Sequence, residues 1–137
     1  MKIASVVGAR PNFVKLIPVH KAISTVVDHI IIHTGQHYDY EMSEVFFKEF
    51  NLPKPKFELE IGSGTACFQI GEMLKKLDQI FLSSKFNLVI VYGDTNSTFA
   101  GALAAEQMLG QATTTHRPGL ALVQSHPDRN SPRSLSG

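Results

Sequence analysis

Four short apolar runs alternate with four helix-like segments over residues 1–109, and this alternation limits the possible folds more than any other feature. The runs contain many Val and Ile residues and occupy residues 3–7, 29–34, 57–61 and 88–92. Between and after them, apolar residues recur at helical spacing in residues 11–23, 38–50, 65–83 and 95–109. Strands buried on both faces and separated by helices predict βαβ units. We therefore expect an α/β protein with a Rossmann-like parallel sheet and helices on both faces.

The end of the chain differs in character. Residues 110–137 contain Gly, Pro, Ser, Thr and Arg without helical periodicity, which predicts an atypical, irregular tail. Within this tail, residues 120–123 could form one further short strand. The predicted organisation is a partial Rossmann-like domain over residues 1–109, followed by the tail over residues 110–137.

Composition excludes several kinds of partner. Thirteen Lys and Arg residues balance twelve Asp and Glu residues, so nothing in the net charge favours nucleic acid or an anionic membrane. No stretch approaches the roughly 20 apolar residues of a membrane span, and the apolar N-terminus is better explained as a buried strand than as a signal peptide. The single Cys67 cannot form an internal disulfide, which fits a cytoplasmic location. The His residues show no metal-ligand spacing, so no metal site is predicted.

The loop after the first strand is the first candidate binding site, since ligands of open parallel sheets bind beyond the carboxyl ends of the strands. Gly8 permits a tight turn, and Pro11 suits the start of a helix whose N-terminus attracts anions. Arg10 could grip a phosphate, and Lys15 lies about one turn further on. The alternative is a simple turn with a solvated Arg. Neither a dinucleotide fingerprint nor a P-loop is present.

The loop after the second strand contains Gln36 and His37, whose side chains could bind a phosphate or a sugar hydroxyl. The alternative is a helix-capping turn with Asp39 as the cap. In the long helix expected over residues 65–83, we expect Thr65 or Ser63 to cap the N-terminus. Gln69 could point into a cleft, but we expect it to be exposed.

The loop after the fourth apolar run places Asp94 at the carboxyl edge of the sheet, with Thr95 and Asn96 behind it in the first helical turn. Asp94 could be a helix cap worth about 1 kcal/mol. It could equally act as a general base or orient one. The residues alone leave both possibilities open.

Together these loops resemble the non-hydrolysing UDP-N-acetylglucosamine 2-epimerases. The motifs that match, in order and spacing, are residues 8–18, 34–37, 69–71 and 91–98, and the resemblance extends from residue 1 to about residue 105. It implies the N-terminal half of a glycosyltransferase-B-type fold, in which two Rossmann-like domains enclose a cleft. It also implies an isomerase that uses no cofactor and contributes to cell-envelope polysaccharide synthesis.

The resemblance further implies a reaction and roles for individual residues. The family interconverts UDP-N-acetylglucosamine and UDP-N-acetylmannosamine by removing the proton at C2, eliminating UDP and adding it back. Arg10 and Lys15 match positions at the phosphates of the UDP-sugar, and Asp94 matches a catalytic carboxylate. Gln36 and His37 line the cleft, which in some bacterial members also holds a second, activating UDP-sugar. Thr95 and Asn96 belong to the same substrate-binding loop as Asp94.

The chain departs from the family pattern after Ala105. A further strand with a His-Val-Glu-Ala-Gly-Leu-Arg motif, whose Glu is catalytic, is expected there and is absent. We therefore expect a truncated epimerase, perturbed by a frameshift or shortened reading frame, with little or no activity alone. One alternative is a non-catalytic remnant that binds anions, UDP or a partner. Another is a fragment of a different glycosyltransferase-B enzyme. An open sheet edge would favour a homo-oligomer.

Overall fold

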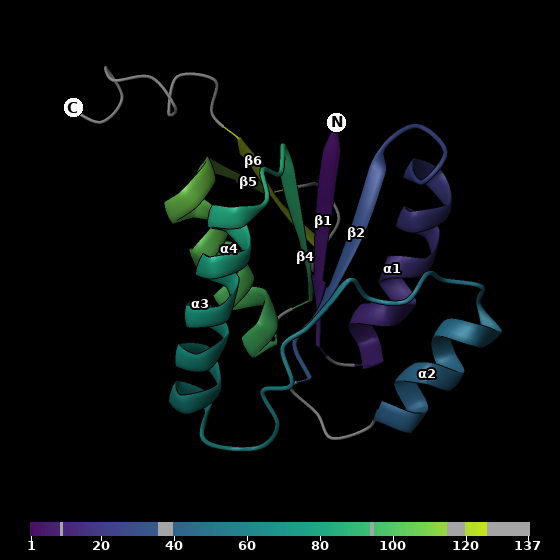
Figure 1. Cartoon of the computed structure of the whole chain (residues 1–137), viewed down its shortest axis with the longest axis horizontal. Coiled ribbons are helices and arrows are strands. Elements are labelled where there is room, and N and C mark those ends of the chain that lie inside the picture. Colours follow the sequence, from purple (N-terminus) through teal and green to yellow (C-terminus); the bar gives the residue numbers. More distant parts are fainter. Residues whose placement is uncertain (9, 36–39, 94, 115–119, 126–137) are drawn as a thin grey trace.

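A mixed six-stranded sheet with helices on both faces forms the described part of the chain (Figure 1). The computed structural model describes residues 1–8, 10–35, 40–93, 95–114 and 120–125. Its elements, in chain order, are β1 (Lys2–Val7), α1 (Arg10–Ile23), β2 (Asp28–His33), α2 (Tyr40–Glu49), β3 (Phe57–Glu58), α3 (Ala66–Ser83), β4 (Leu88–Tyr92), α4 (Asn96–Leu109), β5 (Gly110–Thr114) and β6 (Leu120–Ser125).

The first four strands form the parallel sheet that the sequence predicts. Their order is β3-β2-β1-β4, and each neighbouring pair is parallel. Helices α1 and α2 lie on one face, and α3 and α4 lie on the other (Figure 1). The α/β class with helices on both faces is therefore confirmed. The edge strand β3 has two residues, fewer than the five expected for this run.

The structure differs from the expected irregular tail at residues 110–114 and 120–125. Strand β6 pairs antiparallel with β4, and β5 pairs antiparallel with β6. The strand expected near residues 120–123 is confirmed as part of β6. Strand β5 was not expected because Gly110–Thr114 contains little apolar surface, so that pairing with β6 rather than burial of an apolar run determines its conformation. The division into two parts at residues 109 and 110 stays a prediction.

The face under α3 and α4 is an apolar core. Met73 and Leu77 of α3 are fully buried, and they belong to one cluster with Ile32 of β2 and Val91 of β4. Helix α4 packs very close to the sheet, as its Ala-rich sequence predicts. A methyl group added at Gly101 would lie 2.8 Å from the side chain of Val91, so a larger residue would push the helix outward.

The face under α1 and α2 combines an apolar cluster with buried polar groups. Leu16 of α1 and Ile31 of β2 are buried in this cluster, and the Phe13 ring packs edge-on against Phe47 of α2. The polar residues Ser5 and Asn12 are fully buried on the same side of the molecule as these rings. Every buried polar group needs a hydrogen-bond partner, so this face requires more specific geometry than the other.

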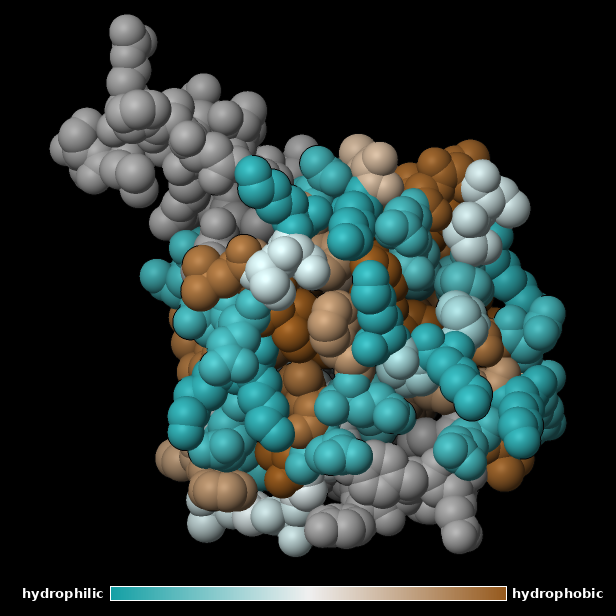
Figure 2. Space-filling view, viewed as in Figure 1, coloured by the Kyte–Doolittle hydropathy of each residue, from teal (hydrophilic) through white to brown (hydrophobic). Residues whose placement is uncertain are grey.

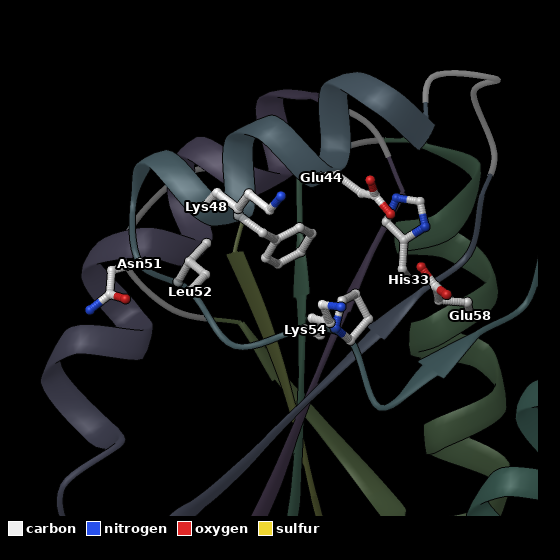
Figure 3. Close-up of a pocket in the computed structure, with 9 residues that line it drawn as sticks. His33, Glu44, Lys48, Asn51, Leu52, Lys54 and Glu58 are labelled. Atoms are coloured by element: carbon white, nitrogen blue, oxygen red, sulfur yellow. The ribbon is translucent and has the colours of Figure 1, made fainter.

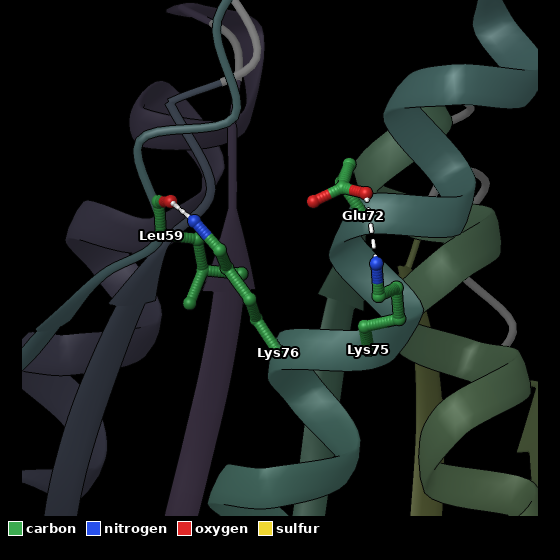
Figure 4. A network of polar contacts seen from close by, with 4 residues as sticks. All are labelled: Leu59, Glu72, Lys75 and Lys76. Carbon is green, nitrogen blue, oxygen red and sulfur yellow. Dashed lines mark hydrogen bonds and ion pairs between the residues drawn. The ribbon is translucent and has the colours of Figure 1, made fainter.

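Polar contacts attach α3 to its surroundings. Thr65 caps the helix as predicted, since its hydroxyl accepts a hydrogen bond from the Phe68 N–H at 3.2 Å. Lys76 reaches across to the Leu59 carbonyl oxygen at 2.6 Å, whereas the neighbouring Lys75 pairs with Glu72 along the helix surface (Figure 4).

Hydrophilic side chains cover most of the face shown in Figure 2, with hydrophobic ones visible between them. Large apolar side chains that are exposed occur at scattered positions, which include Val26, Leu82 and Phe99. Within the described ranges, no helix combines the length and apolar character needed to cross a membrane.

Candidate functional site

The loops that follow β1, β2 and β4 meet at the carboxyl edge of the sheet. In the parallel register Val7 of β1 lies beside His33 of β2, and Val6 lies beside Val91 of β4. The residues that directly follow the three strands are Gly8, Thr34 and Gly93, and they therefore emerge at the same edge. Three loops that are far apart in the sequence are brought together, as the sequence predicts.

Gly8 lies directly against a pair of hydroxyl groups. The Thr34 and Ser97 side chains are buried and hydrogen-bonded to each other at 2.8 Å. A Cβ atom on Gly8 would lie 2.1 Å from the Ser97 oxygen and 2.3 Å from the Thr34 oxygen. Gly8 is therefore required for close packing, whereas the sequence suggested a tight turn as the reason.

Asn12 connects the first loop to the third. Its side-chain oxygen accepts a hydrogen bond from the Gly8 N–H at 3.0 Å, and its amide nitrogen donates to the Tyr92 carbonyl at 2.9 Å. The Thr98 hydroxyl donates to the same carbonyl. Both α1 and α4 are thus anchored to the last residue of β4, and this anchoring fixes where their N-termini lie.

The third loop begins at Gly93, which has a φ of 77°, a left-handed conformation that favours glycine. Thr95 occupies the position directly before α4, and its N–H donates to the Thr98 hydroxyl at 3.3 Å. The helix N-terminus therefore has capping contacts from Thr95 and Thr98. Asp94, the predicted catalytic residue, lies outside the described residues.

Asn96 and Gln69 join the third loop to α3. The Asn96 amide donates to the Gln69 side-chain oxygen at 3.0 Å, and the Gln69 amide donates to the Gly62 carbonyl at 2.7 Å. The expectation that Gln69 is exposed is wrong, because this residue is buried. Its role could not be found from helical periodicity, since the partner groups come from two other loops.

The predicted positive groups follow the first loop. Arg10 is the first residue of α1, and Lys15 is an exposed residue one turn later. The N-terminus of α1 and that of α4 both lie at the carboxyl edge, where the helix dipoles favour anions. Gln36 and His37, the predicted residues of the second loop, lie outside the described residues. The edge can therefore hold an anion, and polar groups surround it.

A separate cavity of about 640 Å³ lies between α2, the end of β2 and the segment that leads into β3 (Figure 3). His33 lies at one end of the cavity beside Glu44 and Glu58, and Lys48 and Lys54 lie further along it. Burial lowers the pKa of His33 to about 4, so its ring is neutral at pH 7. Because two carboxylates and two ammonium groups balance, the cavity favours no single class of ligand. The sequence did not predict it, since it depends on where α2 packs.

Comparison with known proteins gives one consistent family. A sequence model of the family described as UDP-N-acetylglucosamine 2-epimerase matches residues 21–119. A UDP-N-acetylglucosamine 2-epimerase homolog of Methanococcus maripaludis is 58% identical over 108 residues. The UDP-2,3-diacetamido-2,3-dideoxy-D-glucuronate 2-epimerase of Pseudomonas aeruginosa is 48% identical over 110 residues. Each alignment covers 79% of this chain.

A solved structure agrees with these relatives. The UDP-GlcNAc 2-epimerase of Methanocaldococcus jannaschii, crystallised with UDP-GlcNAc and UDP, superimposes with a TM-score of 0.74 at 45% identity. The superposition covers 78% of this chain and 30% of that one. The chain also spans about 30% of the length of the Methanococcus relative and 31% of that of the Pseudomonas relative.

Proposed function

The chain belongs to the UDP-N-acetylglucosamine 2-epimerase family, and we propose that its carboxyl edge forms the nucleotide-sugar half of that family's active site. The observation that carries the proposal is the meeting of the three motif loops at one edge, where Asn12 ties the first loop to the third. The reaction proposed is the interconversion of UDP-N-acetylglucosamine and UDP-N-acetylmannosamine without a cofactor.

In this proposal the phosphates of UDP lie at the N-terminus of α1. The helix dipole and the N–H groups of its first turn attract the phosphates. Arg10 and Lys15 supply the positive charge that the nearly neutral chain otherwise lacks. Gln36, His37, Thr95 and Asn96 contact the substrate, and Asp94 acts on the sugar at C2. The hydrogen bond from Asn96 to Gln69 supports this arrangement because it holds the third loop toward α3.

The substrate class follows from the relatives. Their names describe 2-epimerases of two different UDP-linked sugars, both of which carry acetamido groups. We therefore propose a UDP-linked 2-acetamido sugar as the substrate, with UDP-N-acetylglucosamine as the first choice. We also propose that the protein acts in the cytoplasm, in synthesis of cell-envelope polysaccharide, and that it forms a homo-oligomer.

We expect these 137 residues to be inactive by themselves. The chain spans about 30% of the length of the relatives it matches. Groups that act as one catalytic unit lose nearly all activity when part of the set is missing. A complete active site therefore needs the remaining length of such a relative.

A chimera tests the proposal. Residues 1–105 of this chain are joined to the rest of the Methanococcus maripaludis relative and incubated with UDP-N-acetylglucosamine in heavy water. NMR should show deuterium entering the sugar at C2, and the 137-residue chain alone should show none. Asp94→Asn should abolish exchange in the chimera, and the matched control Asp78→Asn, an exposed residue of α3, should not.

Two results would contradict the proposal. The first is a folded chimera that binds UDP and exchanges no deuterium, which would favour a non-catalytic binding role for this part of the chain. The second is a chimera in which Asp94→Asn exchanges at the rate of the parent.

A further inference from the structure

A chain of four polar side chains runs through the face of the sheet that α1 covers. The Tyr92 hydroxyl lies 2.8 Å from the Ser5 hydroxyl, which lies 2.6 Å from Nε2 of His29. Nδ1 of His29 lies 2.8 Å from Nδ1 of His20. Tyr92 and Ser5 are fully buried, whereas His20 is partly exposed on the last turn of α1. The chain therefore links solvent to a residue two positions before Asp94.

Counting protons allows three arrangements that satisfy all three contacts. In the first, Tyr92 donates to Ser5, Ser5 donates to Nε2 of His29, and Nδ1–H of His29 donates to His20. In the second, every donor and acceptor is reversed, and the chain ends with Ser5 donating to Tyr92. Within the described part of the chain, Ser5 is the hydrogen-bond partner of the Tyr92 hydroxyl. In the third, Ser5 accepts from both Tyr92 and the Nε2–H of His29. The second arrangement leaves the Tyr92 proton, and the third leaves the Ser5 proton, without an acceptor in the chain, so neutral histidines favour the first.

An added proton is incompatible with the first arrangement. Protonated His20 carries a hydrogen on Nδ1 and cannot accept from His29, and protonated His29 carries a hydrogen on Nε2 and cannot accept from Ser5. Either a contact along the chain breaks, or the donors reverse and one of the two buried hydroxyls, that of Ser5 or that of Tyr92, loses its acceptor. Loss of a partner at a buried hydroxyl is unfavourable.

Tyr92 also contacts the groups at the carboxyl edge. Its carbonyl oxygen accepts hydrogen bonds from Asn12 and Thr98, which anchor the starts of α1 and α4. We propose that His20, His29, Ser5 and Tyr92 form a pH-sensitive switch, in which protonation at the histidine end reverses the chain and displaces Tyr92 and the loop that follows it. This inference rests on the hydrogen bonds of the fold and not on the proposed enzymatic activity.

The charged groups around the histidines agree with the switch. Burial, followed by the positive charge that His20 can carry, lowers the pKa of His29 to about 4, and the neighbouring Asp28 carboxylate opposes this shift. Burial also lowers the pKa of His20. Lys21, next to His20 on α1, is exposed, and Lys2 of β1 lies over the Phe86 ring on the other face of the sheet. The groups of β1 and β4 that face the pair are the Ser5 and Tyr92 hydroxyls.

Nitrogen-15 NMR of the 137-residue chain tests the switch directly. At pH 7.5, the imidazole spectra should show the proton of His29 on Nδ1 and that of His20 on Nε2. As the pH falls, both rings should titrate below pH 6.5, and the backbone amides of Gly93 and Thr95 should shift with the same midpoint.

Two variants test whether a change at the histidines reaches Tyr92 and the loop that follows it. Ser5→Ala removes the link between His29 and Tyr92, so the shared amide shifts at Gly93 and Thr95 should disappear. His20→Gln provides an acceptor that does not titrate, so the amide shifts that share the His20 midpoint should disappear, with less disturbance of the core if Ser5→Ala fails to fold. Ser63→Ala, in an exposed loop, is the matched control and should behave as the parent.

His33 titrates in all of these proteins, so only amide shifts that follow the midpoint of the His33 ring itself are assigned to it. A His29 proton on Nε2 at neutral pH would overturn the proposal. Independent titration of the two rings near pH 6.5, or unchanged amide shifts in His20→Gln, would also overturn it.

Discussion

The two faces of the sheet hold their helices in different ways. Under α3 and α4, the contacts are between hydrocarbon side chains such as Met73, Leu77 and Val91. Under α1, apolar packing is combined with a hydrogen-bonded chain through Ser5 and His29. The first kind of contact is insensitive to protonation and tolerant of small shifts, whereas the second depends on direction and on pH.

This difference explains where the candidate site lies. The apolar face provides stability, and the polar face and the loops above it determine the positions of the groups at the carboxyl edge. Asn12 belongs both to the polar face and to the loops above it, because it is buried at the start of α1 and hydrogen-bonded to Gly8 and Tyr92. Changes on the apolar face should therefore alter stability at every pH, and changes on the polar face should alter the edge.

Leu77→Ala should give the largest effect. The residue is fully buried on the apolar face, so the free energy of unfolding should fall by about 2–5 kcal/mol. The loss should be equal at pH 7.5 and pH 5.0 in urea titrations, because no titrating group is involved. Leu82→Ala on the exposed side of α3 is the control and should change stability by less than about 0.5 kcal/mol. A pH-dependent loss for Leu77→Ala would break the distinction between the faces.

Asn12→Ala should give the second-largest effect. It leaves the Gly8 N–H and the Tyr92 carbonyl without this partner, at an expected cost of about 1–3 kcal/mol. The amides of Gly8, Gly93 and Thr95 should shift in NMR spectra, and those in the middle of α3 should not. The exposed Asn87→Ala serves as the control, since its partner, the Lys2 N–H, can bind water instead. An unperturbed edge in folded Asn12→Ala would show that the carboxyl edge does not depend on this residue.

Acid should lower the free energy of unfolding through the histidines of the polar face. Burial lowers the pKa of His29 and of His33 to about 4, below the usual value of 6.5. The unfolded chain therefore binds protons first, and stability that is complete above pH 6.5 is lost as the pH falls toward 4. Partial exposure of the His29 ring limits the loss that comes from this residue to about 1–2 kcal/mol. Urea titrations from pH 7.5 to 4.5 measure it, and constant stability down to pH 4.5 in parent and His20→Gln alike would contradict it.

Substitution of the two adjacent lysines of α3, Lys75 and Lys76, should give the smallest effect. Lys76→Met removes a charged hydrogen bond from α3 to the Leu59 carbonyl and should cost about 0.5–1.5 kcal/mol. Lys75→Met removes an exposed pair with Glu72 and should cost less than about 0.5 kcal/mol. Thermal unfolding of the two variants compares them directly. Equal losses would mean that the Lys76 contact contributes no more than a surface ion pair.

The sequence predicted the regular elements well because their signals are local. The runs that became β1, β2 and β4 are apolar and β-branched, and the helices show clear periodicity. Strand β5 was missed because Gly110–Thr114 is a strand through its pairing with β6. Thr65 was one of two residues predicted to cap α3, and it could be named because capping involves residues three apart.

The site was predicted in outline and missed in detail. The carboxyl-edge rule located the three loops, and Thr95 and Asn96 lie there. The buried position of Gln69 and the contact between Gly8 and two hydroxyls involve residues up to 89 positions apart, from Gly8 to Ser97. The same is true of the chain from Tyr92 to His20. No local pattern encodes such contacts.

The most direct test of the account is a titration of the nitrogen-15-labelled chain with UDP, followed by backbone amide shifts. The account predicts shifts at Gly8, Gly35, Gly93 and Thr95, which saturate with a common affinity and weaken in Lys15→Ala. Residues around the His33 cavity, such as Lys48 and Lys54, should not respond. No shifts at millimolar UDP, or shifts confined to that cavity, would contradict the claim that the carboxyl edge binds the nucleotide.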